Sequence, residues 1–172
     1  CVGNYGGFAE LARADGRFAY PIPEDLPSES AAPLMCAGIT VFAPLVHFHV
    51  KPTMQVGVVG IGGLGHLALQ FAAASGCDVT AFSSNPGKEE EARLFGARRF
   101  VPSADDDSLA VLTNCFDFIL VTVHVDLNWE RYLELLKPNG KLCFVGVPKS
   151  PISVSAMRLI SGRRSICGSP IG

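Results

Sequence analysis

The stretch Val56-Gly57-Val58-Val59-Gly60-Ile61-Gly62-Gly63-Leu64-Gly65-His66 decides the fold that we expect for this chain. It reads as a short apolar strand that passes through a glycine turn into an amphipathic helix. In such a turn Gly60 permits the tight bend, Gly62 lets a pyrophosphate come close to the backbone, and Gly65 lets the helix pack against the strand. The amides at the helix start then face the anion, and the helix dipole favours it.

The residues on both sides of the turn supply the context that a bare glycine pattern lacks. Residues 55–59 read as a buried strand, and Gly76 follows the helix where a C-cap is expected. Residues 78–82 read as a second strand. The apolar residues of the helix between them recur at helical spacing, at Leu64, Leu67, Ala68 and Phe71. The whole is a βαβ unit; the alternative is a glycine turn with only a structural role.

Strands and helices continue to alternate along the chain. Pro33 is expected to start the first helix and Pro44 to end or kink it. The turn residues Lys137-Pro138-Asn139-Gly140 separate a helix from the strand that follows. Six strands with helical crossovers predict an α/β fold, a doubly wound six-stranded parallel sheet of the Rossmann type. The further strands are expected over 98–101, 116–123, 141–147 and 165–168, and the further helices over 26–46, 86–95, 105–112, 129–136 and 154–161.

The first part of the chain differs from the rest. Glycines surround Tyr5 and Phe8, and Pro21-Ile22-Pro23-Glu24-Asp25 predicts an extended passage. We interpret residues 1–25 as the remnant of another domain plus a linker, and residues 26–172 as a dinucleotide-binding domain. The chain starts with Cys1 and not with methionine, which suggests a piece of a longer protein.

The composition of the chain argues against some classes of function. A formal net charge of −2 argues against nucleic acid, whose phosphates require a basic face. The hydrophobic content of 48% and mean hydropathy of +0.31 are high, and could mark surface that packs on something absent. No apolar run approaches the length of a bilayer span, so we expect no membrane segment. The six cysteines form no C-x-x-C pair, which predicts a reducing, cytoplasmic context.

The carboxyl ends of the expected strands define the expected site. Ligands of doubly wound sheets bind there, where the strand order reverses. These ends carry Gly60, Ser83, Thr122, Gly146 and Ser169, and their small size leaves room for a flat cofactor. His124 follows the fourth strand and is a candidate contact on the cofactor side; the alternative is a histidine with a structural role.

The end of the second strand indicates which dinucleotide binds. NAD sites place an acid about 20 residues after the first glycine, where it binds the ribose hydroxyls. Here Ser83, Ser84 and Asn85 stand at that point, with Lys88 nearby. Two hydroxyls, an amide and an ammonium can receive a 2′-phosphate, so we predict NADP(H). The alternative is that these residues only cap the next helix, and the acidic run 89–91 weakens the electrostatic case.

Several motifs together match one family. They are Cys36-Ala37-Gly38-Ile39-Thr40, Gly60-Ile61-Gly62-Gly63-Leu64-Gly65-His66, Ser83-Ser84-Asn85-Pro86-Gly87-Lys88-Glu89-Glu90, Phe95-Gly96-Ala97 and Gly168-Ser169-Pro170-Ile171-Gly172. This pattern resembles the medium-chain, zinc-dependent alcohol dehydrogenases, and within them the cinnamyl-alcohol-dehydrogenase-like aldehyde reductases. The resemblance implies hydride transfer between NADPH and an aldehyde or alcohol, beside a catalytic zinc.

The resemblance also implies roles for individual residues. Cys36 matches a zinc ligand, and Thr40 a residue beside the nicotinamide and phosphates. Residues 60–65 match the pyrophosphate turn. The adenosine-phosphate pocket would comprise Ser83, Ser84, Asn85 and Lys88, and the nicotinamide half would be contacted by Thr122, Gly146, Ser169, Pro170 and Ile171.

The family has parts that this chain lacks, and we draw further expectations from the difference. The other zinc ligands, the proton relay and a structural zinc lobe lie in a GroES-like catalytic domain, of which residues 1–25 would be a remnant. Because Cys36 alone does not hold a zinc ion, we expect the isolated chain to be metal-free and inactive. The resemblance implies a homodimer through the last strand near Ile166, whose edge needs a partner. The alternatives are a dinucleotide-sensing module without enzymatic activity, and a methyltransferase or flavoprotein with a similar turn.

Overall fold

A computed structural model describes residues 8–103 and 105–171 of this chain. The interpretations that concern residues 1–7, and Gly172 of the last motif, lie outside the described residues. The chain divides into two compact units, Cys1–Ala32 and Pro33–Gly172. In the first unit residues 8–27 are mostly exposed, and their regular structure is one short 3₁₀ turn, η1 (Gly16–Phe18), capped by the Asp15 carboxylate. A helix begins at Ser28. The functional meaning of residues 1–25 stays a prediction.

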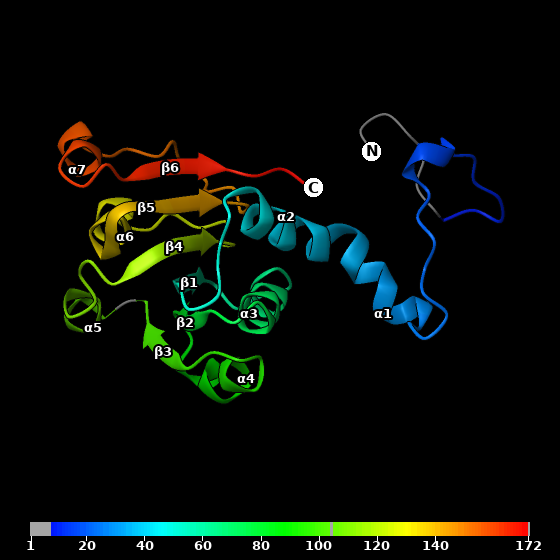
Figure 1. Ribbon diagram of the computed structural model, residues 1–172, viewed down its shortest axis with the longest axis horizontal. Helices are drawn as coiled ribbons and strands as arrows, with labels where there is room; N and C mark the ends of the chain where they lie inside the picture. The colour runs from blue at the N-terminus through cyan, green and yellow to red at the C-terminus, as the bar shows by residue number, and fades with distance from the viewer. Residues whose placement is uncertain (1–7, 104, 172) are drawn as a thin grey trace. The chain divides into compact units, whose positions relative to one another are not determined.

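The second unit is built on one six-stranded parallel sheet (Figure 1). Its strands are β1 (Gln55–Val59), β2 (Asp78–Ser83), β3 (Arg99–Pro102), β4 (Phe116–Val121), β5 (Leu136–Phe144) and β6 (Ser165–Gly168). They lie in the order β3-β2-β1-β4-β5-β6, and every neighbouring pair is parallel. The order reverses between β1 and β4, so their carboxyl ends form the switch point of a doubly wound sheet. The predicted fold class is confirmed.

Helices cover both faces of the sheet, and each face has its own apolar core. On one face α2 (Ile39–His47), α3 (Gly65–Ala74) and α4 (Glu89–Leu94) pack on β1 and β2. On the other face α5 (Asp106–Ala110), α6 (Trp129–Leu135) and α7 (Ala156–Ile160) pack on β4 and β5 (Figure 1). Strands buried on both sides explain why β1, β2 and β4 read as continuous apolar runs rather than as alternating ones.

The predicted βαβ unit is present, with glycines at the turn before its helix and at the end of that helix. β1 passes through Gly60 (φ +92°) into α3, and Gly76 (φ +81°) follows α3 before β2. Both glycines adopt the left-handed backbone region that residues with a Cβ rarely occupy. The Asn85 side chain accepts a hydrogen bond from the Gly87 N–H and so caps the turn η3 (Pro86–Lys88). The predicted cap at Asn85 and the helix end at Gly96 (φ +99°) are confirmed.

The first helix differs from the prediction at both of its prolines. Helical structure begins at α1 (Ser28–Pro33), continues through the π-helical segment η2 (Leu34–Gly38) and ends with α2. Pro33 therefore does not start the helix, and Pro44 lies inside α2 without ending it. A proline removes one backbone hydrogen bond of a helix, and the π-helical segment follows Pro33 directly. Pro44 is buried in α2 together with Val41 and Leu45.

The same helical run also corrects the expectation that no segment is long and apolar enough to span a bilayer. Over Ser28–His47 it has 20 residues and a hydropathy of 1.5, which by length and composition is enough to cross a membrane. No single apolar run in the sequence shows this, because two helical segments and a π segment join to make it. Val41 and Leu45 of α2 face the sheet, where Val41 is fully buried and Leu45 is 4% exposed, whereas Ile39, Phe42 and Val46 are exposed. The core helix of a globular domain passes the same test. Here 28% of the tested window is buried, in part through Val41, Pro44 and Leu45 of α2.

Three strand boundaries also shift, in β4 and β5. β5 begins at Leu136, because Leu136 pairs with Phe116 before the turn residues, and pairing resumes between Lys141 and Phe118. Asn139 has φ +65° between these two pairs of residues, so the predicted turn lies inside β5. β4 ends at Val121 and β5 at Phe144, two and three residues earlier than predicted. The chain leaves the sheet there to form the loops that surround the site.

Candidate functional site

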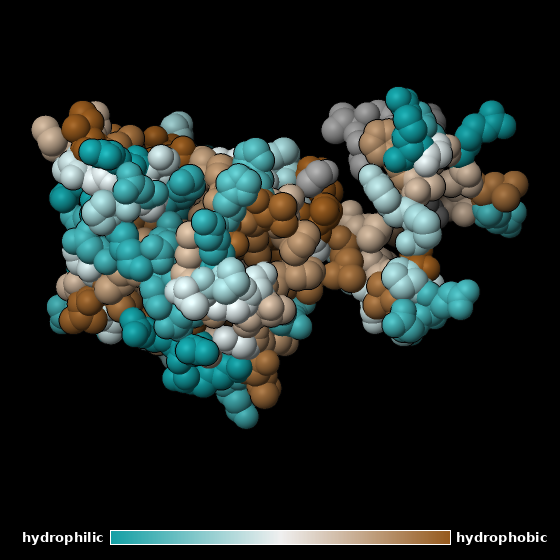
Figure 2. Space-filling model, in the orientation of Figure 1, coloured by the Kyte–Doolittle hydropathy of each residue, from teal (hydrophilic) through white to brown (hydrophobic). Residues whose placement is uncertain are grey.

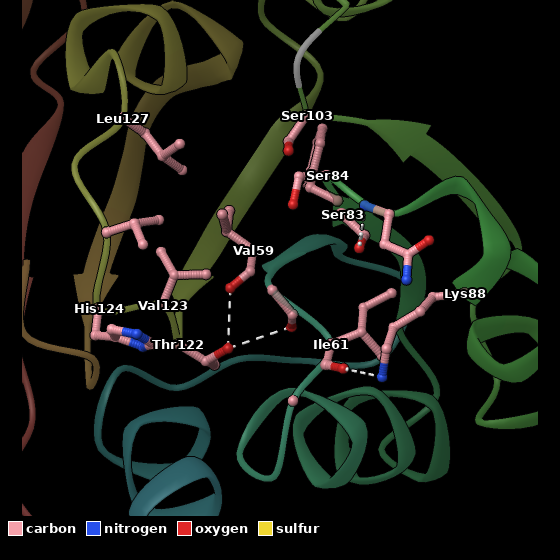
Figure 3. A pocket seen from close by; sticks show the side chains of 15 residues that line it. Val59, Ile61, Ser83, Ser84, Lys88, Ser103, Thr122, Val123, His124 and Leu127 are labelled. Atoms are coloured by element: carbon pink, nitrogen blue, oxygen red, sulfur yellow. Dashed lines mark hydrogen bonds between the residues drawn. The ribbon is translucent and has the colours of Figure 1, made fainter.

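A cavity of about 360 Å³ opens at the switch point of the sheet (Figure 3). It lies where β1, β2 and β4 end, which is where the strand order predicts a ligand. None of the described residues that line it carries a carboxylate. They are Val59, Gly60, Ile61, Gly62, Phe82, Ser83, Ser84, Asn85, Lys88, Ser103, Thr122, Val123, His124, Val125 and Leu127.

The glycine turn forms the floor of this cavity. Within the described residues, the N–H groups of Gly62, Gly63 and Leu64 donate no hydrogen bond to a protein acceptor. They stand at the start of α3, where the helix dipole adds positive potential. An added Cβ at Gly62 or Gly63 would meet no atom within 4 Å, so the turn is open to solvent there. Unpaired amides at an open helix N-terminus form an anion-binding site.

The other two glycines of the turn hold the backbone together. A Cβ on Gly65 would come within 1.9 Å of the Gly60 carbonyl oxygen. A Cβ on Gly60 would come within 2.4 Å of the Val123 side chain, two residues after β4. These distances confirm the predicted reasons for glycine at both positions, a tight turn and close packing of the helix on the strand.

Hydroxyl and ammonium groups line the β2 side of the cavity. Ser83 is 7% exposed, and its hydroxyl accepts a hydrogen bond from the Asn85 N–H at 3.2 Å. The Lys88 ammonium donates to the Ile61 carbonyl oxygen at 2.8 Å, which ties η3 to the glycine turn (Figure 3). Lys88 also lies 3.1 Å from the Glu91 carboxylate. One acid of the run 89–91 therefore offsets part of the lysine charge, whereas Glu89 is paired with Arg93.

The β4 side of the cavity is held by one hydroxyl and one glycine. The Thr122 hydroxyl lies 2.9 Å from the Val59 carbonyl oxygen and 3.2 Å from that of Gly60, both of which can accept its proton (Figure 3). A Cβ on Gly146 would come within 2.2 Å of the Val123 carbonyl oxygen. Thr122 thus fixes the end of β1, and Gly146 is required by the packing between the loops after β4 and β5.

The apolar wall of the cavity comes from residues that the sequence did not single out. Val123, Val125 and Leu127 follow β4 and line the cavity at alternate positions, and His124 lines it between them. Ser103, after β3, completes the opposite side, with its N–H bonded to the Ser83 carbonyl oxygen. The apolar residues Val123, Val125 and Leu127, next to the predicted end of the fourth strand, could have indicated this wall. The candidate contact at His124 stays a prediction.

The remaining predicted site residues do not line this cavity. Thr40 lies half-buried in α2, and Ser169 follows β6, where its N–H donates to the Phe144 carbonyl oxygen at 3.1 Å. Cys36 lies exposed in η2. No group of three or more His, Cys, Asp or Glu side chains within residues 8–103 and 105–171 could hold a metal ion. A catalytic zinc ion takes three protein ligands, so the residues described here do not fit one. The others outside the cavity lining are Gly63, Leu64, Gly65, Gly146, Pro170 and Ile171.

A family model identifies the chain. The model for zinc-binding dehydrogenases matches residues 63–172, from the glycine turn through β6.

The chain belongs to the zinc-binding dehydrogenase family.

Individual relatives of the chain agree with the family model. The aldehyde reductase AdhA of Synechocystis is 44% identical over 171 residues, which are 99% of this chain and 51% of that protein. A solved cinnamyl alcohol dehydrogenase of Sorghum bicolor superposes with a TM-score of 0.85 at 40% identity, over 88% of this chain and 43% of that one. The enzyme of this type from Helicobacter pylori, solved in complex with NADP(H), has a TM-score of 0.74 at 36% identity, over 86% and 42%. The chain thus spans about half the length of the relatives it matches.

The family resemblance expected from the sequence is confirmed. The geometry of the cavity shows what its groups can bind. The turn amides can bind a diphosphate, the hydroxyls and the lysine of the β2 side can bind further anionic oxygens, and the apolar wall can hold a flat ring.

Proposed function

We propose that this chain is the NADP(H)-binding part of an alcohol dehydrogenase or aldehyde reductase. The observation that carries the proposal is a set of three unpaired amides at the start of α3, facing an open turn beside a 360 Å³ cavity without carboxylates. The cavity has the volume of a small-molecule site and the chemistry of a phosphate site. Relatives named aldehyde reductase and cinnamyl alcohol dehydrogenase support it.

The pyrophosphate of the cofactor would lie on the glycine turn. Gly62 lines the cavity and leaves its own Cβ position empty, so backbone and phosphate can approach closely. The adenine would lie against the apolar wall after β4. Thr122 keeps the end of β1 in place through its hydrogen bond to Val59. This arrangement orients the dinucleotide along the switch point, with its nicotinamide toward the ends of β4, β5 and β6.

The β2 side of the cavity favours NADP(H) over NAD(H). A carboxylate at the end of β2 would repel a 2′-phosphate, and the residues there are Ser83 and Ser84. Their hydroxyls and the Lys88 ammonium can donate to phosphate oxygens. The relative from Helicobacter pylori solved with NADP(H) supports this choice.

The whole protein would transfer hydride between NADPH and a small aldehyde or alcohol. NADPH supplies the hydride when it is bound. The contribution of this chain is to bind the cofactor and hold its reactive end in one orientation. Polarising the carbonyl would require zinc, for which Cys36 is the single predicted ligand here. A dinucleotide-sensing module without enzymatic activity is not favoured, since the named relatives are reductases and dehydrogenases.

The proposal extends to assembly and location. A homodimer through β6 would cover the open edge of the sheet, because β5 is the only described strand paired with β6. The protein would be cytoplasmic, with α2 held in the core.

Matched methyl substitutions test the proposal. We expect Gly62→Ala to weaken NADPH binding at least about tenfold, because a methyl group would separate phosphate from amide. Gly16→Ala adds the same methyl in equally open space on η1, outside the glycine turn and the cavity lining, and should leave affinity within about twofold. Fluorescence titration of NADPH measures both. Equal affinities for the two variants would contradict a phosphate site on this turn.

A further inference from the structure

Two thiols lie side by side on the last two strands of the sheet. β5 and β6 are parallel, and their register sets Cys143 beside Cys167. Cys143 is fully buried in the core beneath α2 and α3, and Cys167 packs against that same core. Because side chains alternate between the faces of a strand, both cysteines point to the same face of the sheet.

The two thiols also interact with each other. The contact between the two thiols raises the pKa of Cys143, and burial acts in the same direction. The same contact lowers the pKa of Cys167, and the charge of Lys141 adds to this. Cys167 is the more exposed of the two, so it is the thiol that a small oxidant reaches. Its Sγ–H donates to the Leu142 carbonyl oxygen at 3.7 Å.

The spacing of the strands suits a covalent bond between these residues. Neighbouring strands lie about 4.7–4.9 Å apart, and disulfides join Cα atoms about 4.4–6.8 Å apart. The other described cysteines differ in this respect. Cys36, Cys77 and Cys115 lie outside the strands, so none of them has a register partner.

We propose that Cys143 and Cys167 form a dithiol that peroxide oxidises to a disulfide, which ties the edge strand β6 to β5. The Cys167 thiolate attacks one oxygen of hydrogen peroxide, the O–O bond breaks, and hydroxide leaves with Cys167 as a sulfenic acid. The Cys143 sulfur then attacks the sulfur of Cys167, its proton passes to the departing oxygen, and water leaves. Two thiols and one peroxide become one disulfide and two waters.

The position of this dithiol gives the bond a structural consequence. β6 pairs with β5 alone among the described strands, so the disulfide would add a covalent tie to the least supported strand. The Ser169 N–H bond to Phe144, which starts the segment after β6, lies two residues beyond Cys167. The inference stands on β5 and β6 alone and is independent of the proposed cofactor.

Peptide mapping of the full chain tests the inference. The chain is treated with hydrogen peroxide, its free thiols are blocked with iodoacetamide, and it is digested with trypsin. Cleavage after Lys141, Lys149 and Arg164 separates residues 142–149 from the peptide that begins at Ser165. We expect these two peptides to be joined, with the mass of the pair less two hydrogen atoms, and dithiothreitol to separate them again.

Cysteine variants complete the experiment. Cys143→Ala should abolish the joined peptide and leave a sulfenic acid at Cys167 that dimedone captures. Cys115→Ala, a half-buried control in the loop before β4, should leave the joined peptide intact. Because Cys143 lies in the core, Cys167→Ala serves as a second variant and should abolish the joined peptide at a less buried position. The inference is overturned if peroxide oxidises exposed Cys36 while residues 143 and 167 stay alkylated, or if Cys167 joins another cysteine.

Discussion

At the scale of single residues, the glycines of the turn have two separate roles. Gly65 is glycine because any Cβ would collide with the Gly60 carbonyl oxygen, so its reason lies inside the fold. Gly62 has open space at its Cβ position, so the fold does not require glycine there. Because Gly62 lines the cavity without being required by packing, the proposed ligand is what would call for glycine there. This distinction separates positions for stability from positions for binding within one motif.

Cofactor selectivity is predicted at Ser83 and Lys88. Ser83→Asp should weaken NADPH and improve NADH, because a carboxylate repels a 2′-phosphate and accepts from ribose hydroxyls. Lys88→Met should weaken NADPH by about tenfold, which corresponds to one charge-assisted hydrogen bond, and leave NADH unchanged. Fluorescence titrations with both cofactors measure this. Lys88 also bonds Ile61; if that bond is its only role, Lys88→Met will weaken both cofactors equally.

At the scale of elements, α2 is apolar on two sides, one of them buried and the other exposed. Val41 and Leu45 face the sheet and are buried in its core. Ile39, Phe42 and Val46 are among the exposed apolar residues, and Figure 2 shows hydrophobic surface over this helix. The buried side accounts for the place of α2 in the domain.

A matched pair of substitutions in α2 tests this assignment. Leu45→Ala should lower the free energy of unfolding by about 3 kcal/mol, because it leaves a cavity in the core. Val46→Ala, on the 57% exposed neighbouring residue, should change it by less than about 0.5 kcal/mol. Chemical denaturation followed by circular dichroism measures both. Similar small effects for the two variants would mean that α2 does not pack on the sheet.

The helix α6 carries a polar atom that its packing leaves unsatisfied. The Tyr132 hydroxyl is buried without a hydrogen-bond partner in the described structure, among the rings of Phe82 and Trp129. Burial without a partner costs about 1–3 kcal/mol, so Tyr132→Phe should raise the free energy of unfolding by about 1 kcal/mol. Denaturant titration of the two proteins measures the change. A loss of stability would show that the hydroxyl has a partner, such as a buried water.

The same burial predicts a dependence on pH. It raises the pKa of Tyr132, so the phenol loses its proton in the unfolded chain before it does so in the folded one. The unfolded state then binds fewer protons, and stability falls as pH rises above the ordinary tyrosine pKa of about 10. Tyr132→Phe should remove this part of the alkaline loss.

At the scale of the whole molecule, the open edge of the sheet predicts self-association. The Ser169 N–H faces β5, and because N–H directions alternate along a strand, that of Gly168 faces away. We expect the chain to sediment as a dimer, and Gly168→Pro to shift it to the monomer by removing that donor. Sedimentation velocity measures the change, with circular dichroism as a check of the fold. A chain that is monomeric before substitution, or a variant that stays dimeric, would contradict pairing through β6.

The sequence by itself determined the βαβ unit, the six parallel strands and the cavity side formed by Ser83, Ser84 and Lys88. These features depend on local rules, since glycine spacing, apolar periodicity and caps act within a few residues. Only the tertiary structure decided the rest: the continuous helix through Pro33 and Pro44, the wall of Val123, Val125 and Leu127, and the pairing of Cys143 with Cys167. Each of these depends on burial or register between segments distant in the chain, which local preferences do not encode.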